Sequence, residues 1–302
     1  MGNKALDVNS VFEQADLGIT VRGSDWIFTV CSIMGACCLA VIGHSFTRPA
    51  HQRLFHQLIM VALFVGCVSN FAVGSNLGQV PIQVEFARGG KVVAAGTREI
   101  FYARYIDWFI TTPLLLSALL LTASISWSTL LAVILVDEIM VVCYLLGALT
   151  QTTYKWGFWT FGVAAFLYVA YSVLIVGRRG ANNVGGAVRT TYNISGIVLI
   201  TTLLLYPIAF GCSEGGNVIH PDSEAIFYGI LDLLAKVVFP FLLLWGHRNI
   251  SFESLGLNTT EAGRPVLREK GDYHASGIDG VGNGVDTQPT TANGANGTTT
   301  AV

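Results

Sequence analysis

The stretch ARYIDWFITTPLLLSALLLT, residues 103–122, is the most informative part of the chain. Apart from Arg104 and Asp107 it is uncharged. A helix of about 20 residues rises about 30 Å, the thickness of the hydrocarbon core of a bilayer. Ionisable residues inside such a span are costly and by default mark a functional site. The segment therefore predicts a membrane-spanning helix that carries chemistry.

Six more apolar runs of similar length flank this one. The seven spans are predicted at about 26–46, 54–75, 101–121, 127–149, 156–177, 194–212 and 225–246. Four tryptophans fall at span ends, where an amphipathic ring settles at the level of the lipid headgroups: Trp26, Trp127, Trp156 and Trp245. The 302 residues are 52% hydrophobic and 12% charged, about half the charged fraction of a soluble domain. We therefore expect an all-α integral membrane protein, a seven-transmembrane-helix bundle whose partner is membrane lipid.

Residues 79–98, between the second and third spans, have another pattern. Val80, Ile82 and Val84 alternate with other residues, Gly89 and Gly90 supply a turn, and residues 92–95 follow. This predicts a short β-hairpin over one mouth of the bundle. After residue 250 the chain is too polar and too rich in Gly, Thr and Asn to fold. The predicted organisation is an N-terminal segment (1–25), a seven-helix domain (26–250) and a disordered tail (251–302).

Charge and cysteine content exclude several classes of partner. A net charge of −2, with no dense stretch of Lys or Arg, gives no basic field for nucleic acid. The six cysteines lie in or beside apolar runs without CxxC spacing, which predicts packing residues and neither a metal site nor a disulfide framework.

Loop charges give a small bias in orientation. Five lie on one side and four on the other: Arg48, Arg53, Arg178, Arg179 and Arg189 against Arg88, Lys91, Arg98 and Lys155. Because cytosolic loops carry the excess of positive charge, this favours an extracellular N-terminus and a cytosolic C-terminus. The expected location is the plasma membrane.

Ionisable residues inside the spans are few. They are Arg104, Asp107, Asp137, Glu138, Asp232 and Lys236. Residues three or four apart share one face of a helix, so Arg104, Asp107 and Thr111 form one stripe, and Asp232 and Lys236 form another. One lysine and two carboxylates can therefore meet inside the bundle. They could form an ion pair that fixes helix register, load protons in a transporter, or surround an amine condensed with an aldehyde, whose cationic product needs a nearby carboxylate.

The local sequences favour the third interpretation. ARYIDWFITTPLLL (103–116) and LDLLAK (231–236) closely resemble helices of the microbial rhodopsins, the bacteriorhodopsin-like retinal proteins, and most of all their fungal members. The resemblance runs through about 26–250. It implies all-trans retinal bound covalently to Lys236 as the Schiff-base lysine, with Asp107 as primary counterion and proton acceptor and Asp232 as second counterion. It implies no enzyme activity and no metal.

The resemblance also assigns a proton pathway and a pocket. The pathway comprises Arg104, Thr111, which is expected to bond the Asp107 carboxyl, Ser213, Glu214 and Glu224. The retinal pocket comprises Tyr105, Trp108, Thr112, Asp137, Met140, Trp159, Leu203, Tyr206 and Pro207. At Leu203 the family usually has a tryptophan, and Asn70 replaces a tyrosine expected near Asp232.

Ala118 is the departure with the largest consequence. Efficient pumps of this family carry a carboxylate proton donor at this position, and the neighbouring Ser117 cannot donate a proton at neutral pH. The expected function is a light-activated, outward proton-translocating rhodopsin with slow reprotonation. Two alternatives stay open: a sensory photoreceptor with a signalling partner and no net transport, or an opsin-like structural or chaperone protein. Assembly as a homo-oligomer is a further expectation of the resemblance.

Overall fold

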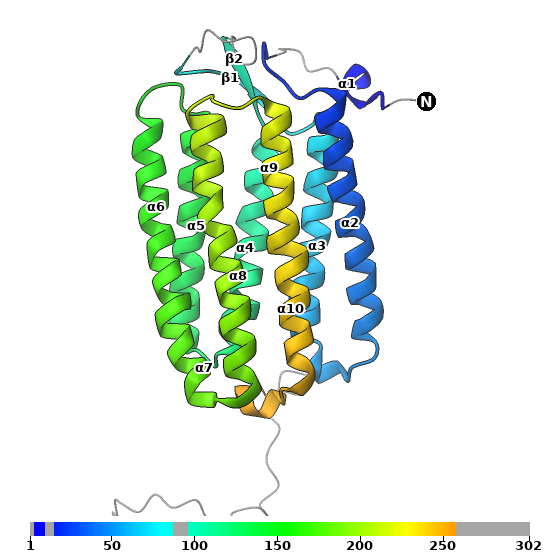
Figure 1. The fold of residues 1–302 in the computed structure, drawn as a ribbon, viewed down its shortest axis with the longest axis vertical. Coiled ribbons are helices and arrows are strands. Elements are labelled where there is room, and N and C mark those ends of the chain that lie inside the picture. Colours follow the sequence, from blue (N-terminus) through cyan, green and yellow to red (C-terminus); the bar gives the residue numbers. More distant parts are fainter. Residues whose placement is uncertain (1–2, 10–14, 87–95, 258–302) are drawn as a thin grey trace, which may run out of the picture. The chain divides into compact units, whose positions relative to one another are not determined.

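The computed structural model describes residues 3–9, 15–86 and 96–257, which fall within one compact unit, Met1–Pro265. In this part of the chain, seven helices are long and apolar enough to cross a membrane. They run side by side, with a small two-stranded sheet at one end (Figure 1). The predicted class, a seven-transmembrane-helix bundle with a β-hairpin between the second and third helices, is confirmed.

The first four spans are single α-helices, whereas the last three contain π-helical turns. The single helices are α2 (Val21–Ser45), α3 (Leu54–Gly74), α4 (Tyr102–Thr122) and α5 (Trp127–Leu149). The fifth span joins α6 (Lys155–Tyr171), the π turn η2 (Ser172–Gly177) and α7 (Arg178–Val184). The sixth joins α8 (Gly186–Phe210) and the π turn η3 (Gly211–Gly215). The seventh joins α9 (Pro221–Leu233), the π turn η4 (Leu234–Val238), α10 (Phe239–Gly246) and the 3₁₀ turn η5 (His247–Asn249). Short elements are α1 (Ala5–Val8), η1 (Ala50–Gln52) and η6 (Phe252–Leu255).

Local sequence explains where several helices begin and end. The Ser126 hydroxyl caps α5 by accepting the Thr129 N–H, and Pro221 opens α9, where its missing N–H costs nothing. Between α7 and α8 only Gly185 lies outside a helix, at φ +77°. This left-handed conformation favours glycine, so a single residue separates two spans.

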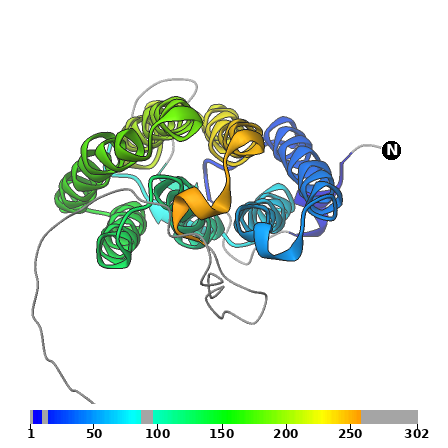
Figure 2. The ribbon, with the colours of Figure 1, turned by 90° about the horizontal axis from the view of Figure 1, so that it is seen from below.

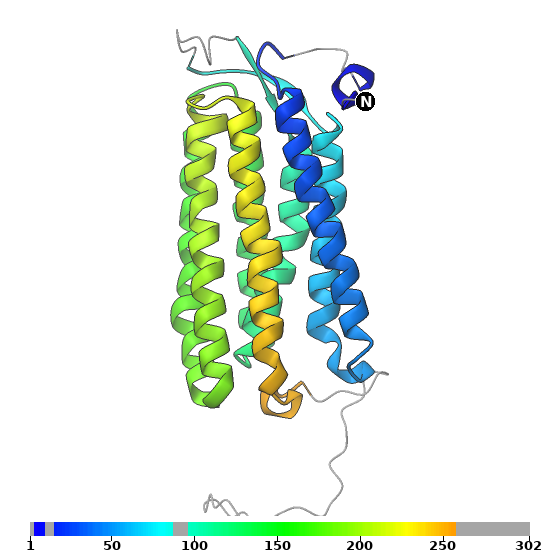
Figure 3. The same cartoon turned by 45° about the vertical axis from the view of Figure 1, so that its right-hand side comes forward.

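The helices form two rows that face each other (Figure 2). One row contains α6, α8, α9 with α10, and α2, and the other contains α5, α4 and α3 (Figures 2 and 3). In α4, 67% of the most apolar part of the helix is buried, the highest share among the seven spans. The helix that carries Arg104 and Asp107 is therefore the centre of the bundle.

The sheet covers one end of the bundle, which we call the sheet end. β1 (Val80–Gln83) pairs antiparallel with β2 (Thr97–Ile100), with Val80 opposite Ile100. The predicted turn at Gly89 and Gly90, and the predicted second strand at 92–95, lie outside the described residues. Arg98 and Glu99 of β2 are buried, so this hairpin is part of the packed interior as well as a cover.

The opposite end, which we call the loop end, differs from the prediction in two places. Arg178, Arg179 and Arg189 were expected in a loop, but they lie in α7 and α8. Hydropathy detects only the apolar part of a helix and misses its polar extension. Residues 252–255, expected in the tail, form η6, where Leu255 is buried and Phe252 packs edge to face on Phe55. The rest of the predicted tail, 258–302, lies outside the described residues.

Candidate functional site

Lys236 lies in the middle of the bundle, within the π turn η4. Its side chain is 1% exposed, and its Nζ forms an ion pair with Oδ2 of Asp107 on α4. Nζ also lies 3.1 Å from Oδ1 of Asp232, one turn earlier in the same span. The three groups that the sequence predicted to meet are thus in contact, and π turns of this kind occur often at functional sites.

The two aspartates have different surroundings. Oδ1 of Asp232 also accepts hydrogen bonds from the Tyr206 hydroxyl at 2.7 Å and the Trp108 indole at 3.3 Å. Oδ1 of Asp107 is buried and has no hydrogen-bond partner among the described residues. Asp232 is therefore held by neighbouring donors, whereas one oxygen of Asp107 lacks a hydrogen-bond partner within the described chain.

Thr111 contacts Asp107, including its carboxyl group, and Asn70 bonds within its own helix. The Thr111 hydroxyl donates to the main-chain carbonyl of Asp107 at 2.8 Å, because a hydroxyl within a helix readily bonds the carbonyl one turn back. The Asn70 amide donates to the carbonyl of Gly66 at 2.8 Å and approaches Sδ of Met34. The hydrogen-bond partners of Asp232 in the described chain do not include Asn70.

Gly66 on α3 provides the slot for the lysine side chain. A methyl group on Gly66 would lie 3.2 Å from Cδ of Lys236 and 2.8 Å from Sδ of Met34. Only a residue without Cβ leaves the lysine stem room at its present position. No pattern in the sequence indicates this role, because a glycine within an apolar run resembles any small packing residue.

An apolar cavity adjoins this centre. Its walls comprise Trp108, Thr112, Met140, Val141, Tyr144, Leu203, Tyr206 and Phe210, and five of these eight belong to the predicted pocket. Thr112 also donates to Oδ2 of Asp137 at 2.5 Å. Trp159 and Pro207 are joined by a hydrogen bond from the indole to the Pro207 carbonyl at 3.0 Å. Five of the nine predicted pocket residues therefore line the cavity, and Asp137 bonds one of the five. Tyr105 bonds Glu214 instead, nearer the sheet end.

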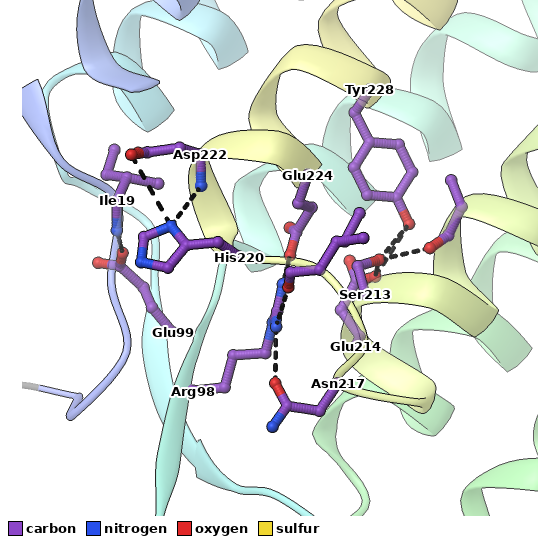
Figure 4. Close-up of polar contacts among 12 residues, drawn as sticks. Ile19, Arg98, Glu99, Ser213, Glu214, Asn217, His220, Asp222, Glu224 and Tyr228 are labelled. Carbon is purple, nitrogen blue, oxygen red and sulfur yellow. Dashed lines mark hydrogen bonds and ion pairs between the residues drawn. The ribbon is translucent and has the colours of Figure 1, made fainter. Parts of the chain in front are cut away.

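From Lys236 toward the sheet end, the interior is charged. Nη1 of Arg104 lies 2.7 Å from Glu224 and 3.6 Å from Glu214, and the guanidinium stacks over the ring of Tyr228. Arg98 from β2 contacts the other oxygen of Glu224 at 2.6 Å (Figure 4). Glu224 is thus held between two arginines.

Glu214 is surrounded by hydroxyl groups. It accepts hydrogen bonds from Ser213 and from Tyr228 at 2.9 Å (Figure 4). A third comes from Tyr105 at 3.1 Å. Ser213 and Glu214 lie in the π turn η3, and Glu224 lies in the first turns of α9. We refer to Arg98, Arg104, Glu214 and Glu224 as the sheet-end network. The sequence had placed both glutamates in or beside a loop.

Two of the predicted loop charges at this end, Arg98 and Lys155, are buried, and Lys155 begins α6. Arg98 is 1% exposed and bonds Asn217 and the Ile219 carbonyl at 2.8 Å as well as Glu224. Strand alternation in β2 places Arg98 and Ile100 on the same face, and Ile100 is also buried. That alternation is the one sequence signal that could have indicated an inward arginine.

Toward the loop end the interior is apolar. On α4, Leu115, Leu116, Ala118 and Leu119 are all at most 1% exposed. Buried polar side chains at this end bond main-chain carbonyls or one another: Thr122 donates to the Ala118 carbonyl, His247 Nε2 lies 3.1 Å from the Thr122 hydroxyl, and Tyr192 donates to the Val173 carbonyl. Among the described residues toward this end, Ala118 therefore has leucine neighbours and no buried carboxyl group.

Comparison with known families agrees with this geometry. The model of the family described as bacteriorhodopsin-like protein matches residues 26–250. The chain belongs to the bacteriorhodopsin-like family. It is 46% identical to the opsin-like protein carO of Fusarium fujikuroi over 97% of this chain and 95% of that protein, which confirms the resemblance to fungal opsins.

Two solved structures have the same fold. The light-driven proton pump LR (Mac) from Leptosphaeria maculans is 30% identical, with a TM-score of 0.73, over 79% of this chain and 99% of that one. The light-driven proton pump rhodopsin CsR from Coccomyxa subellipsoidea is 30% identical, with a TM-score of 0.72, over 76% and 99%.

Microbial rhodopsins bind retinal, and the residues of this bacteriorhodopsin-like chain fit that group. The amine of Lys236 lies between two carboxylates, the slot at Gly66 accommodates its stem, and the adjoining cavity has aromatic and aliphatic walls. Aromatic side chains supply most of the contact area in such pockets.

The double pairing of Glu224 makes the sheet end sensitive to Arg98. We expect Arg98→Met to lower the free energy of unfolding by about 3 kcal/mol, because it leaves a buried carboxylate with one of its two cations missing. Thermal loss of the helical circular dichroism signal measures this effect.

Two variants serve as controls. Arg22→Met, at an exposed arginine of the same end, should leave the unfolding temperature within the error of the parent. Adding Glu224→Gln to Arg98→Met should recover part of the loss, since the orphaned charge is removed. If the Arg98→Met protein is as stable as the parent, the Arg98–Glu224 ion pair does not stabilise the sheet end as we expect.

Proposed function

We propose that the protein is a light-driven, outward proton pump with retinal on Lys236, and that it reloads slowly. The observation that carries the proposal is the polarity of the interior on either side of Lys236. Charged groups continue from Asp107 toward the sheet end, whereas buried hydrocarbon lines the way to the loop end. Relatives of the same fold described as light-driven proton pumps support it.

Each residue of the centre has a definite task. Bound retinal supplies light absorption and an isomerisation that changes the proton affinity at Nζ of Lys236. Asp107 accepts the Nζ proton on its unpartnered Oδ1. Asp232, held by Tyr206 and Trp108, keeps its negative charge and balances the cation before transfer. Arg104 carries the resulting change of charge toward Glu224 and Glu214.

The charge balance of the buried groups favours a stored proton. Three cations, Lys236, Arg104 and Arg98, face four carboxyl groups, Asp107, Asp232, Glu214 and Glu224. With all seven ionised, this ion-paired set would carry one uncompensated negative charge, which is costly for buried groups. One proton on Glu214, which three hydroxyl groups surround, makes the set neutral and provides a proton to release.

The proposed orientation follows from the direction of transport. Outward pumping requires the sheet end to face the outside and the loop end to face the cytosol, as the loop charges favour. The expected location is the plasma membrane.

A sensory photoreceptor is the second candidate function. Ala118 favours it, because loss of the donor prolongs the deprotonated state of Lys236 and gives a signalling partner time to respond. A structural or chaperone role without retinal is disfavoured by the lysine itself, since a buried Lys236 with two counter-charges is costly to maintain for packing alone.

The first prediction concerns retinal binding. Adding all-trans retinal to the expressed protein should give a visible absorption band, and Lys236→Ala should abolish it, because no other amine adjoins the cavity walls that the structure describes. Lys155→Ala is the matched control, since this lysine is also buried but begins α6. Absence of a band in the parent contradicts the proposed function as a whole.

The second prediction concerns transport. Illuminated cells or vesicles should acidify the outer medium steadily, and an uncoupler should abolish the signal. Asp107→Asn should reduce the rate at least about tenfold, because a positioned proton acceptor is worth roughly 10²-fold or more. A visible band without acidification favours the sensory photoreceptor.

The third prediction concerns reloading. Ala118→Asp should shorten the photocycle about 10- to 100-fold, since it restores an acid three helical turns from Asp107. Ser117→Asp is the control, because successive helix positions point about 100° apart and Ser117 is less buried. Flash spectroscopy measures both. Equal photocycle times in the parent and Ala118→Asp contradict the donor argument.

A further inference from the structure

Successive residues of β2 point to opposite sides, as in any strand. Arg98 points into the bundle, toward Glu224 and Asn217, whereas Glu99 points toward the N-terminal segment, where its Oε2 accepts the Ile19 N–H at 2.9 Å (Figure 4). Glu99 is 5% exposed. The mechanism above gives this buried carboxyl group no role.

Glu99 lines a cavity of about 260 Å³ at the sheet end. Asn76, Gln79, Gly18 and Ile19 are among the other described residues of its wall. Oδ1 of Asn76 and Oε1 of Gln79 are buried and have no hydrogen-bond partner in the described part of the protein. Buried polar oxygens in a space of this size are normally satisfied by water, so Glu99 faces a hydrated chamber.

Glu99 also responds to the sheet-end network. Burial raises its pKa to about 7, and the negative charge of Glu224 adds to the increase, while the Ile19 N–H and Arg104 act against it. Glu99 therefore changes charge near neutral pH. The effect of Glu224 on this pKa also means that a change of protonation inside the network alters the affinity of Glu99 for a proton.

The two glutamates of the network lack such access to water. Glu214 and Glu224 are both at most 5% exposed, and their oxygens are taken up by arginine and hydroxyl groups. A proton leaving them needs a further carrier that borders water, and Glu99 is the carboxyl group next in the chain to Arg98.

We propose that Glu99 is the exit site for protons, the last proton-holding group between the sheet-end network and the water chamber beside the N-terminal segment. This inference rests on the proposed outward pump and adds a residue to it. In each turnover the Glu99 carboxylate gains one proton that the network loses, and then loses it to water in the chamber. Its own charge is unchanged over the cycle.

The expected pH dependence follows because only the ionised form of Glu99 can accept a proton from the network. Above about pH 7, Glu99 is mostly ionised and can accept the proton at once. Below that pH it is already protonated, so release waits for the end of the cycle. Other titratable or charged groups at this end include Glu85, Asp16, Arg22, Arg98, Arg104, Glu214, His220, Asp222 and Glu224. Asp16 accepts hydrogen bonds from Thr97 that hold its pKa below the usual range, so Asp16 stays ionised.

A titration without light tests the site itself. Infrared difference spectra between the full-length parent and Glu99→Gln in lipid nanodiscs, recorded in the dark with and without retinal, should show one carboxylic acid that ionises with a midpoint near pH 7. Glu99→Gln should remove this band, and Glu99→Asp should retain a shifted one. Glu85→Gln, at a glutamate of the same end bonded to the Trp156 indole, should leave it in place. If the band is missing in the parent, or persists in Glu99→Gln, the assignment is overturned.

Flash-induced proton release tests the role. A pH-indicating dye outside the vesicles reports when protons are released. Around pH 7, the ratio of early to late release should rise about tenfold for each unit of increase in pH. In Glu99→Gln this dependence should disappear between pH 6 and 8, whereas Glu85→Gln and His220→Gln should keep it. A pumping Glu99→Gln protein with the parent's pH profile overturns the exit role alone. A parent that releases no protons overturns the pump and the exit role together.

Discussion

The structure depends on one requirement: a charge removed from water must meet an opposite charge. Lys236 satisfies it through Asp107 on α4 and Asp232 in its own span. This contact places the last span against the central helix, and the cavity walls gather beside it. The same requirement, applied to Arg104 and Arg98, connects α4, α9 and the sheet. A short chain of ion pairs therefore organises both the packing and the chemistry of the centre.

Asymmetry along the bundle axis distinguishes this arrangement from a simple structural ion pair. Toward the sheet end, arginines, glutamates and tyrosines form a continuous polar interior, whereas toward the loop end leucines pack around Ala118. In low dielectric, a proton moves readily only where groups can stabilise its charge. The fold thus provides an easy route on one side of Lys236 and a barrier on the other.

The spacing of residues within single helices predicted the contacts around Lys236 well, but it did not predict the contacts at the sheet end. Asp232 and Lys236 are four residues apart, so helix geometry alone puts them on one face, and few other charges could pair with them. Arg98 is 126 residues from its partner Glu224. A polar hairpin carries no signal for so distant a partner, and the helical extensions that hold Arg178 and Glu214 are invisible to hydropathy. Gly66 was missed because its role depends on the lysine stem opposite.

The distance along the chain between Arg98 and Glu224 also affects how the protein is made. Synthesis proceeds from the N-terminus, so the hairpin is complete long before the seventh span leaves the ribosome. Until then Arg98 lacks its buried partner and must remain hydrated. The Arg98–Glu224 ion pair can form only after the last helix is inserted, so a chain truncated before α9 would leave this arginine without its carboxylate partner.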